Sequence, residues 1–137
     1  MATYNKHNQF VEDLAEKVHN LGSDQLVAYL TSVAPVAGNS VLADLTQIAY
    51  TNLSSRNITT STSSQTAGTY KLVLADLVLT ASGAVEAFRY AGLYNDTPTA
   101  PADPLIAWWD YGSSVTLASG ETFTYDFSAT NGVLQIV

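Results

Sequence analysis

Residues Phe88–Tyr111, FRYAGLYNDTPTAPADPLIAWWDY, are the stretch on which the expected fold depends. Its two ends, 88–94 and 105–111, are rich in aromatic and apolar residues and predict two β-strands. The segment between them, Asn95–Pro104, carries three prolines. Proline donates no hydrogen bond to a β ladder and biases the preceding residue away from helix, so we expect a long, stiff, exposed loop here.

Two adjacent tryptophans in the second strand divide its side chains between two surfaces. Successive residues of a strand point to opposite faces, so Trp108 and Trp109 cannot share one. Trp109 belongs to the more apolar row of side chains, whereas Trp108 shares its face with Asp110. We therefore expect Trp109 in the core and Trp108 towards the exterior or a partner.

One amphipathic helix is predicted near the N-terminus, over Lys6–Asn20. Phe10, Leu14 and Val18 recur four residues apart and form one apolar stripe. Gly22 stands where a left-handed residue would end the helix. The stripe must cover either the chain's own sandwich or a neighbouring subunit, and the pattern leaves both open.

The rest of the chain reads as β-structure, with turn signals between about eight expected strands. This spacing is typical of an antiparallel β-sandwich or barrel. The longest strand is expected over Thr69–Thr80, whereas 41–50 fits a buried strand or a short helix equally well. Tight hairpin turns are predicted at Ser119-Gly120 and at Asn131-Gly132.

Length and composition narrow the class of protein. At 137 residues the chain can bury a core as one domain, divided into an N-terminal helical arm over residues 1–22 and a β-sandwich over residues 23–137. The absence of cysteine excludes a disulfide framework and a cysteine nucleophile. The net charge is −7 and the five basic residues are scattered, which argues against nucleic-acid binding. No apolar segment suits a signal sequence or a membrane span, so we expect a chain made in the cytoplasm and not exported by itself.

Few residues suggest chemistry. His7 and His19 flank the expected helix, about 18 Å apart at about 1.5 Å per residue, so they cannot share a metal ion and are expected to be solvated. Asp96 and Asp103 lie in an oxygen-rich loop of the kind that can hold Ca²⁺, but they lack the regular spacing of a dedicated site, and a turn role is favoured. No nucleophile elbow, phosphate-binding glycine loop or zinc spacing is present. We predict no enzymatic activity, no cofactor and no metal.

The aromatic side chains allow two interpretations. Tyr90, Tyr94, Trp108, Trp109 and Tyr111 could form a platform for sugars, as aromatics on a β-sandwich sometimes do. The interpretation we favour is a core together with a contact between subunits, because exposed tryptophan and tyrosine are enriched at the centres of protein interfaces.

Most of the chain outside Thr31–Thr60 also carries a family likeness. The segments concerned are YNKHNQFVEDLAEKVHNLGSDQL (4–26), SSQTAGTYKLVLADL (63–77), FRYAGLYNDT (88–97), DPLIAWWDYGSSVTLASGETFTYDF (103–127) and NGVL (131–134). In these the chain resembles a group of small virion proteins of tailed bacteriophages and prophages. The resemblance implies a capsid cement or decoration protein with a jelly-roll-like β-sandwich that clamps adjacent capsomers from outside.

The resemblance also sets the expected partners and location. The chain would bind the phage major capsid protein as a homo-oligomer, dimer or trimer, on the exterior of the virion, with no nucleic acid and no membrane. The residues expected at the interface are Phe10, Leu14, Val18, Tyr94, Asp96, Pro98, Pro101 and Trp108. Two alternatives remain: a tail or head-spike module that binds host glycans through Tyr94, Trp108 and the proline loop, and, more remotely, a glycan-cleaving enzyme that uses two of the aspartates.

Overall fold

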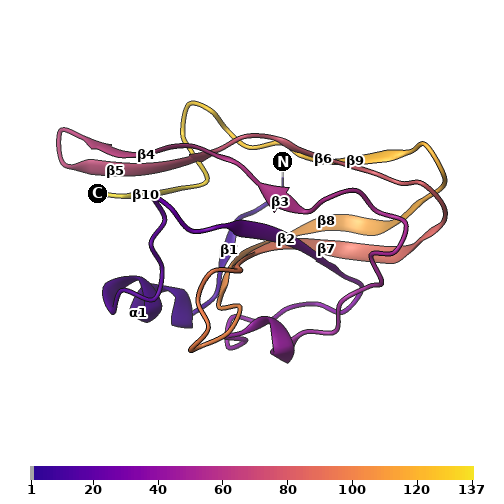
Figure 1. Cartoon of the computed structure of the whole chain (residues 1–137), viewed down its shortest axis with the longest axis horizontal. Coiled ribbons are helices and arrows are strands. Elements are labelled where there is room, and N and C mark those ends of the chain that lie inside the picture. Colours follow the sequence, from indigo (N-terminus) through magenta and orange to yellow (C-terminus); the bar gives the residue numbers. More distant parts are fainter. Residues whose placement is uncertain (1) are drawn as a thin grey trace.

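The computed structural model describes residues 2–137 and shows two stacked layers of antiparallel β-sheet with a short helix at one end (Figure 1). This confirms the expected mainly-β class and the antiparallel sandwich. The elements are β1 (Asn5–Lys6), α1 (Gln9–Ala15), β2 (Leu26–Thr31), the 3₁₀ turn η1 (Leu42–Asp44), β3 (Asn57–Ile58), β4 (Thr60–Thr66), β5 (Thr69–Leu74), β6 (Leu77–Thr80), β7 (Val85–Asn95), β8 (Leu105–Leu117), β9 (Thr122–Tyr125) and β10 (Leu134–Ile136).

The lower layer in Figure 1 is a five-stranded sheet, in the order β1-β8-β7-β2-β3 over the described residues. The aromatic hairpin β7–β8 lies at its centre, with Ala91 opposite Trp109 and Gly92 opposite Trp108. Both strands run further than the alternation predicted. β8 continues through Gly112, whose φ of 97° is accessible to glycine without strain.

The upper layer consists of two smaller sheets, β10-β5-β4 and β6-β9. The single strand expected over Thr69–Thr80 is broken at Ala75 and Asp76 into β5 and β6. There the Ala75 N–H donates to the carbonyl of Thr59, and the Asp76 carboxylate accepts from the Phe127 N–H. Contacts with two other segments therefore divide the expected strand into two. The first half, β5, pairs with β4 and β10, and the second half, β6, pairs with β9.

The main core fills the space between the layers. Leu30, Phe88 and Leu93 of the lower sheet meet Leu72 and Leu79 of the upper layer, and all five are fully buried. Complete burial of a large apolar side chain contributes roughly 1.5–3 kcal/mol, so this interface is the main source of stability.

A smaller apolar cluster lies on the opposite face of the lower sheet. It comprises Val27, Tyr29, Tyr94 and Leu105, with Leu42, Leu45 and Trp108 packed against it. The segment 32–50, which includes η1, passes beneath this face in Figure 1. The expectation that the two tryptophans face opposite ways is confirmed, since Trp109 packs on the main core. Trp108 is half-buried on the second face.

The N-terminal helix is shorter than predicted. It ends at Ala15, with Lys17 rather than Gly22 in the left-handed conformation, at φ 71°. Residues 2–22 are also built into the sandwich: β1 pairs with β8, and Phe10 and Leu21 belong to the main core. The helix thus packs on its own chain, which the sequence pattern had left open.

Two predicted hairpins are wrong, because the strands on either side of each turn do not pair with each other. Ser119-Gly120 leads from β8 in the lower layer to β9 in the upper layer, and Asn131-Gly132 leads from β9 to β10, which belong to separate sheets. Both segments turn, and both glycines have positive φ. The turn residues predicted the bend correctly, but they carry no information on which strand the chain joins next. The ambiguous segment 41–50 contains only the short η1 and otherwise irregular backbone.

Gly92 is required by the packing of Tyr29. A Cβ at position 92 would lie 2.1 Å from Cζ of the Tyr29 ring, which crosses β7 at this point. Because Tyr29 is completely buried, the ring has no free space into which to move.

We expect Gly92→Ala to lower the free energy of unfolding by about 3 kcal/mol or more, since overpacking a dense core forces side chains and backbone apart. Urea unfolding followed by tryptophan fluorescence measures the change. Gly38→Ala is the matched control, because a Cβ there meets nothing within 4 Å. Equal stability of the two variants would contradict the steric account.

Candidate interaction surface

The structure separates the residues predicted to contact a partner into covered and accessible groups. Phe10 and Tyr94 are only 4% and 6% exposed, so their side chains are covered by the chain itself. Trp108 is half-buried, with its ring centroid 4.5 Å from that of His7. Leu14 and Val18 are half-buried at the surface of the helical end.

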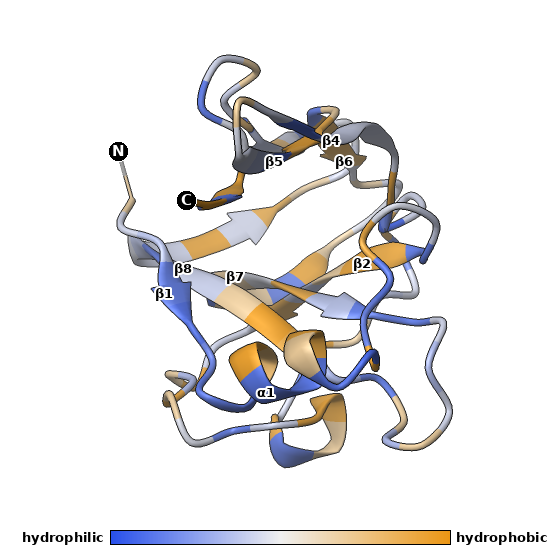
Figure 2. Ribbon diagram, turned by 90° about the vertical axis from the view of Figure 1, so that its left-hand side faces the viewer, coloured by the Kyte–Doolittle hydropathy of each residue, from blue (hydrophilic) through white to orange (hydrophobic). Residues whose placement is uncertain are grey.

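Leu14 and Val18 line a groove between α1 and β10, which we call the α1–β10 groove. It consists of two adjoining hollows of about 560 and 480 Å³ that share Leu14 and Ile136 as lining residues. Figure 2 looks onto this end of the molecule, with α1 below and the C-terminal strand above. Val11 and Ile136 lie in it with 49% and 48% of their surface exposed, so the apolar character of the groove reaches solvent.

Basic side chains gather around this groove. Lys17 lines one hollow and Lys6 the other. These are two of the chain's five basic residues, in a protein with a net charge of −7. The basic residues look scattered along the sequence, because Lys6 and Lys17 reach the same groove only in the folded chain.

The proline loop is fastened to its neighbours. The Asp96 N–H donates to the carbonyl of Gln25, and the Gln25 N–H donates to the Thr97 hydroxyl. Asp96 is exposed, whereas Pro98 and Pro101 are half-buried. Three of the predicted contacts in this loop therefore lie at the surface, on a rigid support.

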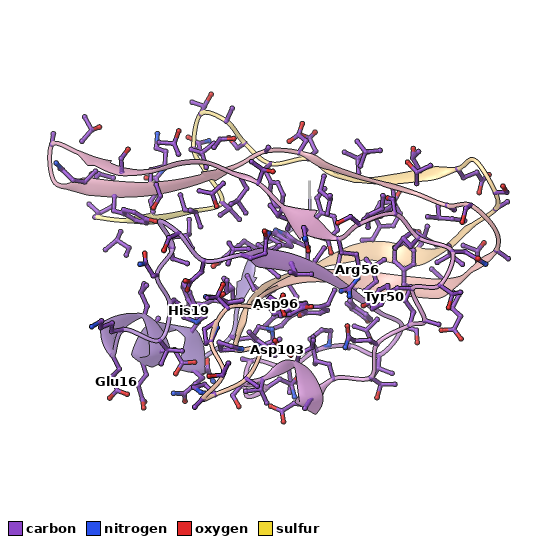
Figure 3. The ribbon with its side chains drawn as sticks, viewed as in Figure 1. Glu16, His19, Tyr50, Arg56, Asp96 and Asp103 are labelled. Carbon is purple, nitrogen blue, oxygen red and sulfur yellow. The ribbon has the colours of Figure 1, made fainter. Side chains whose placement is uncertain are left out.

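Two carboxylates meet in this region. Burial, with the neighbouring Asp96 carboxylate, raises the pKa of Asp103. Figure 3 shows both residues beside the lower sheet. Within residues 2–137, however, no three histidine, aspartate or glutamate side chains are grouped so that they could hold a metal ion.

The prediction that both histidines are solvated is wrong. His7 is 0% and His19 is 5% exposed. The helix ends before residue 19, and the chain then turns so that the His19 ring lies 5.1 Å from that of Phe10. A helical periodicity carried to residue 20 would have pointed this side chain to solvent.

His7 lies between the N-terminal segment and the second apolar cluster. Its Nε2 is 3.2 Å from the hydroxyl of Tyr29, and its ring packs on Trp108. Burial lowers the pKa of His7 to about 4, against the opposing influence of the Val36 and Asn39 carbonyls and of the Asp44 carboxylate. His7 is therefore a neutral structural side chain at pH 7.

His19 belongs to a buried polar network. The Asn95 side-chain amide donates to His19 Nδ1 at 3.1 Å and to the Asp24 carboxylate at 2.7 Å. Because Nδ1 accepts, the proton of the neutral ring lies on Nε2. Burial lowers the pKa of His19, although Asp13 and Asp24 oppose the shift. The network joins the end of the helical segment to the beginning of the proline loop.

β3 pairs with only the first part of β2, and the side chains of Arg56 and Tyr50 cover the remaining edge of β2 (Figure 3). The Arg56 guanidinium donates to the carbonyl of Ala28 at 2.6 Å and lies 3.7 Å above the ring of Tyr50. The Tyr50 hydroxyl accepts from the N–H of Leu30 at 2.9 Å. Backbone groups that a foreign strand could pair with are thereby occupied.

We expect stability to fall as the pH drops from about 6.5 to about 4. The folded-state pKa of His7, about 4, lies below the ordinary value of 6.5, so the unfolded chain takes up the proton first. The contribution is complete above about pH 6.5, and up to about 3 kcal/mol is lost by pH 4. Urea unfolding between pH 7.5 and pH 4 measures it, and His7→Gln should show a shallower dependence. An unchanged slope in that variant would assign the effect to other groups.

No helix among residues 2–137 has the length and apolar character needed to cross a bilayer. Comparison with known proteins gave no matching family model, no matching curated protein and no matching solved structure.

Proposed function

We propose that the protein is a structural subunit of a tailed-bacteriophage virion, a decoration protein that binds the outside of the major capsid protein shell and stabilises it. It acts there as a homo-oligomer, with a jelly-roll-like sandwich as the rigid body, and catalyses no reaction. The observation that carries this proposal is the α1–β10 groove. It is an apolar surface that reaches solvent and is lined by α1, the segment that follows it, β10 and the residues that precede β10.

Three further features support a role in protein assembly. The sequence resembles small phage virion proteins in the aromatic hairpin and in the N-terminal segment, both of which contribute side chains to the main core. The proline loop presents exposed Asp96 on a fastened backbone, which suits recognition with little loss of conformational entropy. The acidic net charge limits unspecific association of subunits before assembly.

The glycan-binding alternative has less support. It requires Tyr94 and Trp108 to form an open platform, but Tyr94 is 6% exposed and Trp108 packs against His7. Exposed aromatic surface remains at Tyr111, which is 56% exposed. This ring packs edge-on against Phe123, with 5.5 Å between the ring centroids, so it does not offer a sugar a row of open ring faces.

A decoration protein stabilises the shell because it binds the assembled lattice and not the separated capsid subunits. We therefore expect purified virions to contain this chain in numbers comparable with the major capsid protein. Particles stripped of it should lose their DNA at lower temperature, and adding back the purified chain should restore the original melting temperature. Mock-stripped particles serve as the control. A few copies per particle would indicate a tail or spike location, and unchanged melting would rule out stabilisation.

A further inference from the structure

The strand β10 presents an open edge. It is the outer strand of the β10-β5-β4 sheet, and within residues 2–137 its only strand partner is β5. The edge of β2 is closed by Arg56 and Tyr50, whereas no charged side chain or proline protects residues 134–136 themselves. Unpaired N–H and C=O groups on such an edge are a template for another strand.

The open edge borders an apolar surface. In Figure 1, β10 is the strand of its sheet nearest to α1, and the α1–β10 groove lies between them. A strand added to β10 would lie along Val11 and Leu14 of α1 and Val18 beyond its end, which together we call the α1 stripe. Backbone pairing and apolar burial would thus occur together, as in other cases of strand addition.

Charge favours a second copy of this chain as the occupant. Two molecules of net charge −7 repel each other over most of their surfaces, but the groove is bordered by Lys6 and Lys17. One of the two hollows is also lined by the carboxylate of Asp24, so the groove carries both signs of charge. A two-fold contact sets this lining against its own copy, so opposite charges are available on both sides of the contact.

The shortness of β10 also favours self-pairing. A strand of three residues offers few backbone hydrogen bonds, too few to bind a foreign peptide tightly. Across a two-fold axis every contact occurs twice, and each copy supplies both the strand and the surface that receives it. Leu134 and Ile136 of one copy would then cover apolar surface of the other.

We propose that two copies of this chain associate through antiparallel pairing of their β10 strands, centred on Gln135, with each β10 lying against the α1 stripe of the other copy. The pairing joins the two three-stranded sheets into one six-stranded sheet. The biological role of this pairing rests on the proposed function, for which it names the contact between subunits. The pairing itself is tested on the isolated chain.

The opposite edge of the same sheet is the rival site. β4, with the sequence TSTSSQT, also lacks a second partner strand. Its pairing with β5 is irregular between Thr60 and Thr62, and its side chains are hydroxyl-rich and mostly exposed. Such an edge is well solvated and brings no apolar surface to a contact, so we assign the pairing to β10.

Cysteine cross-linking distinguishes the two edges, because the chain has no cysteine of its own. Residues facing each other across an antiparallel two-fold have Cα atoms about 4.5–5.5 Å apart, within the range of a disulfide. Under mild oxidation Gln135→Cys should form a covalent dimer, whereas Ser64→Cys, in the middle of β4, should stay monomeric at the same concentration. Dimers from Ser64→Cys alone, or from neither variant, would overturn the proposal.

Sedimentation equilibrium of the full chain provides the second measurement. We expect a reversible dimer that Val11→Lys and Ile136→Lys each weaken at least about tenfold, a loss of roughly 1.4 kcal/mol. Both positions are about half exposed, so the fold should persist, and urea midpoints verify this. Val78→Lys is the matched control, since Val78 is 51% exposed in β6 at the other end of the molecule (Figure 1).

A monomer at all concentrations, a trimer, or a dimer indifferent to the two groove variants would each refute the β10 pairing. None of these results bears on capsid binding, which the melting of stripped and restored particles measures separately. Conversely, a β10-paired dimer that leaves capsid melting unchanged would retain the pairing and remove the decoration role.

Discussion

A buried hydroxyl, that of Tyr125, ties the two layers of the sandwich together. It lies 2.9 Å from the carbonyl of Tyr29 and 3.1 Å from that of Gly92, so β9 of the upper layer is joined to β2 and β7 of the lower sheet. Burial raises the pKa of Tyr125 well above its ordinary value, which keeps the hydroxyl protonated and able to donate. In an apolar interior no solvent replaces such a bond, so the relative position of the layers is held where the core is densest.

The same point of the lower sheet organises its other face. With no side chain at Gly92, the Tyr29 ring can lie across β7, and its hydroxyl then reaches His7. The His7 ring in turn covers Trp108. The N-terminal segment is held by this stack as well as by the short β1–β8 pairing, and the helix that follows is set at the end of the sandwich. The placement of α1, and therefore of the α1–β10 groove, depends on this series of contacts.

The edges of the two sheets differ in a way that bears on the proposed function. Arg56 and Tyr50 hydrogen-bond to the backbone groups of β2 that lie beyond β3. In contrast, β10 pairs only with β5 among the described strands, so its other edge is open. Beside that open edge lie the half-exposed apolar residues Val11 and Ile136. A fold that closes one edge and leaves another beside apolar surface is suited to directed contact with protein, in keeping with the proposed role in a virion shell.

The alternation of side chains by itself determined the mainly-β class, the two central strands around the proline loop, and the opposite faces of Trp108 and Trp109, because these follow from the period of an extended chain. Tertiary structure decided which segments became partners. The strand expected over 69–80 broke where Thr59 and Phe127 bind it, two expected hairpins became crossings between sheets, and His7 and His19 were buried instead of solvated. Leu14 and Val18 were recognisable from helical spacing, but their proximity to Ile136 of β10 was not. Local pattern reports which side of an element is apolar; the element against which that side packs depends on contacts between residues far apart in the chain.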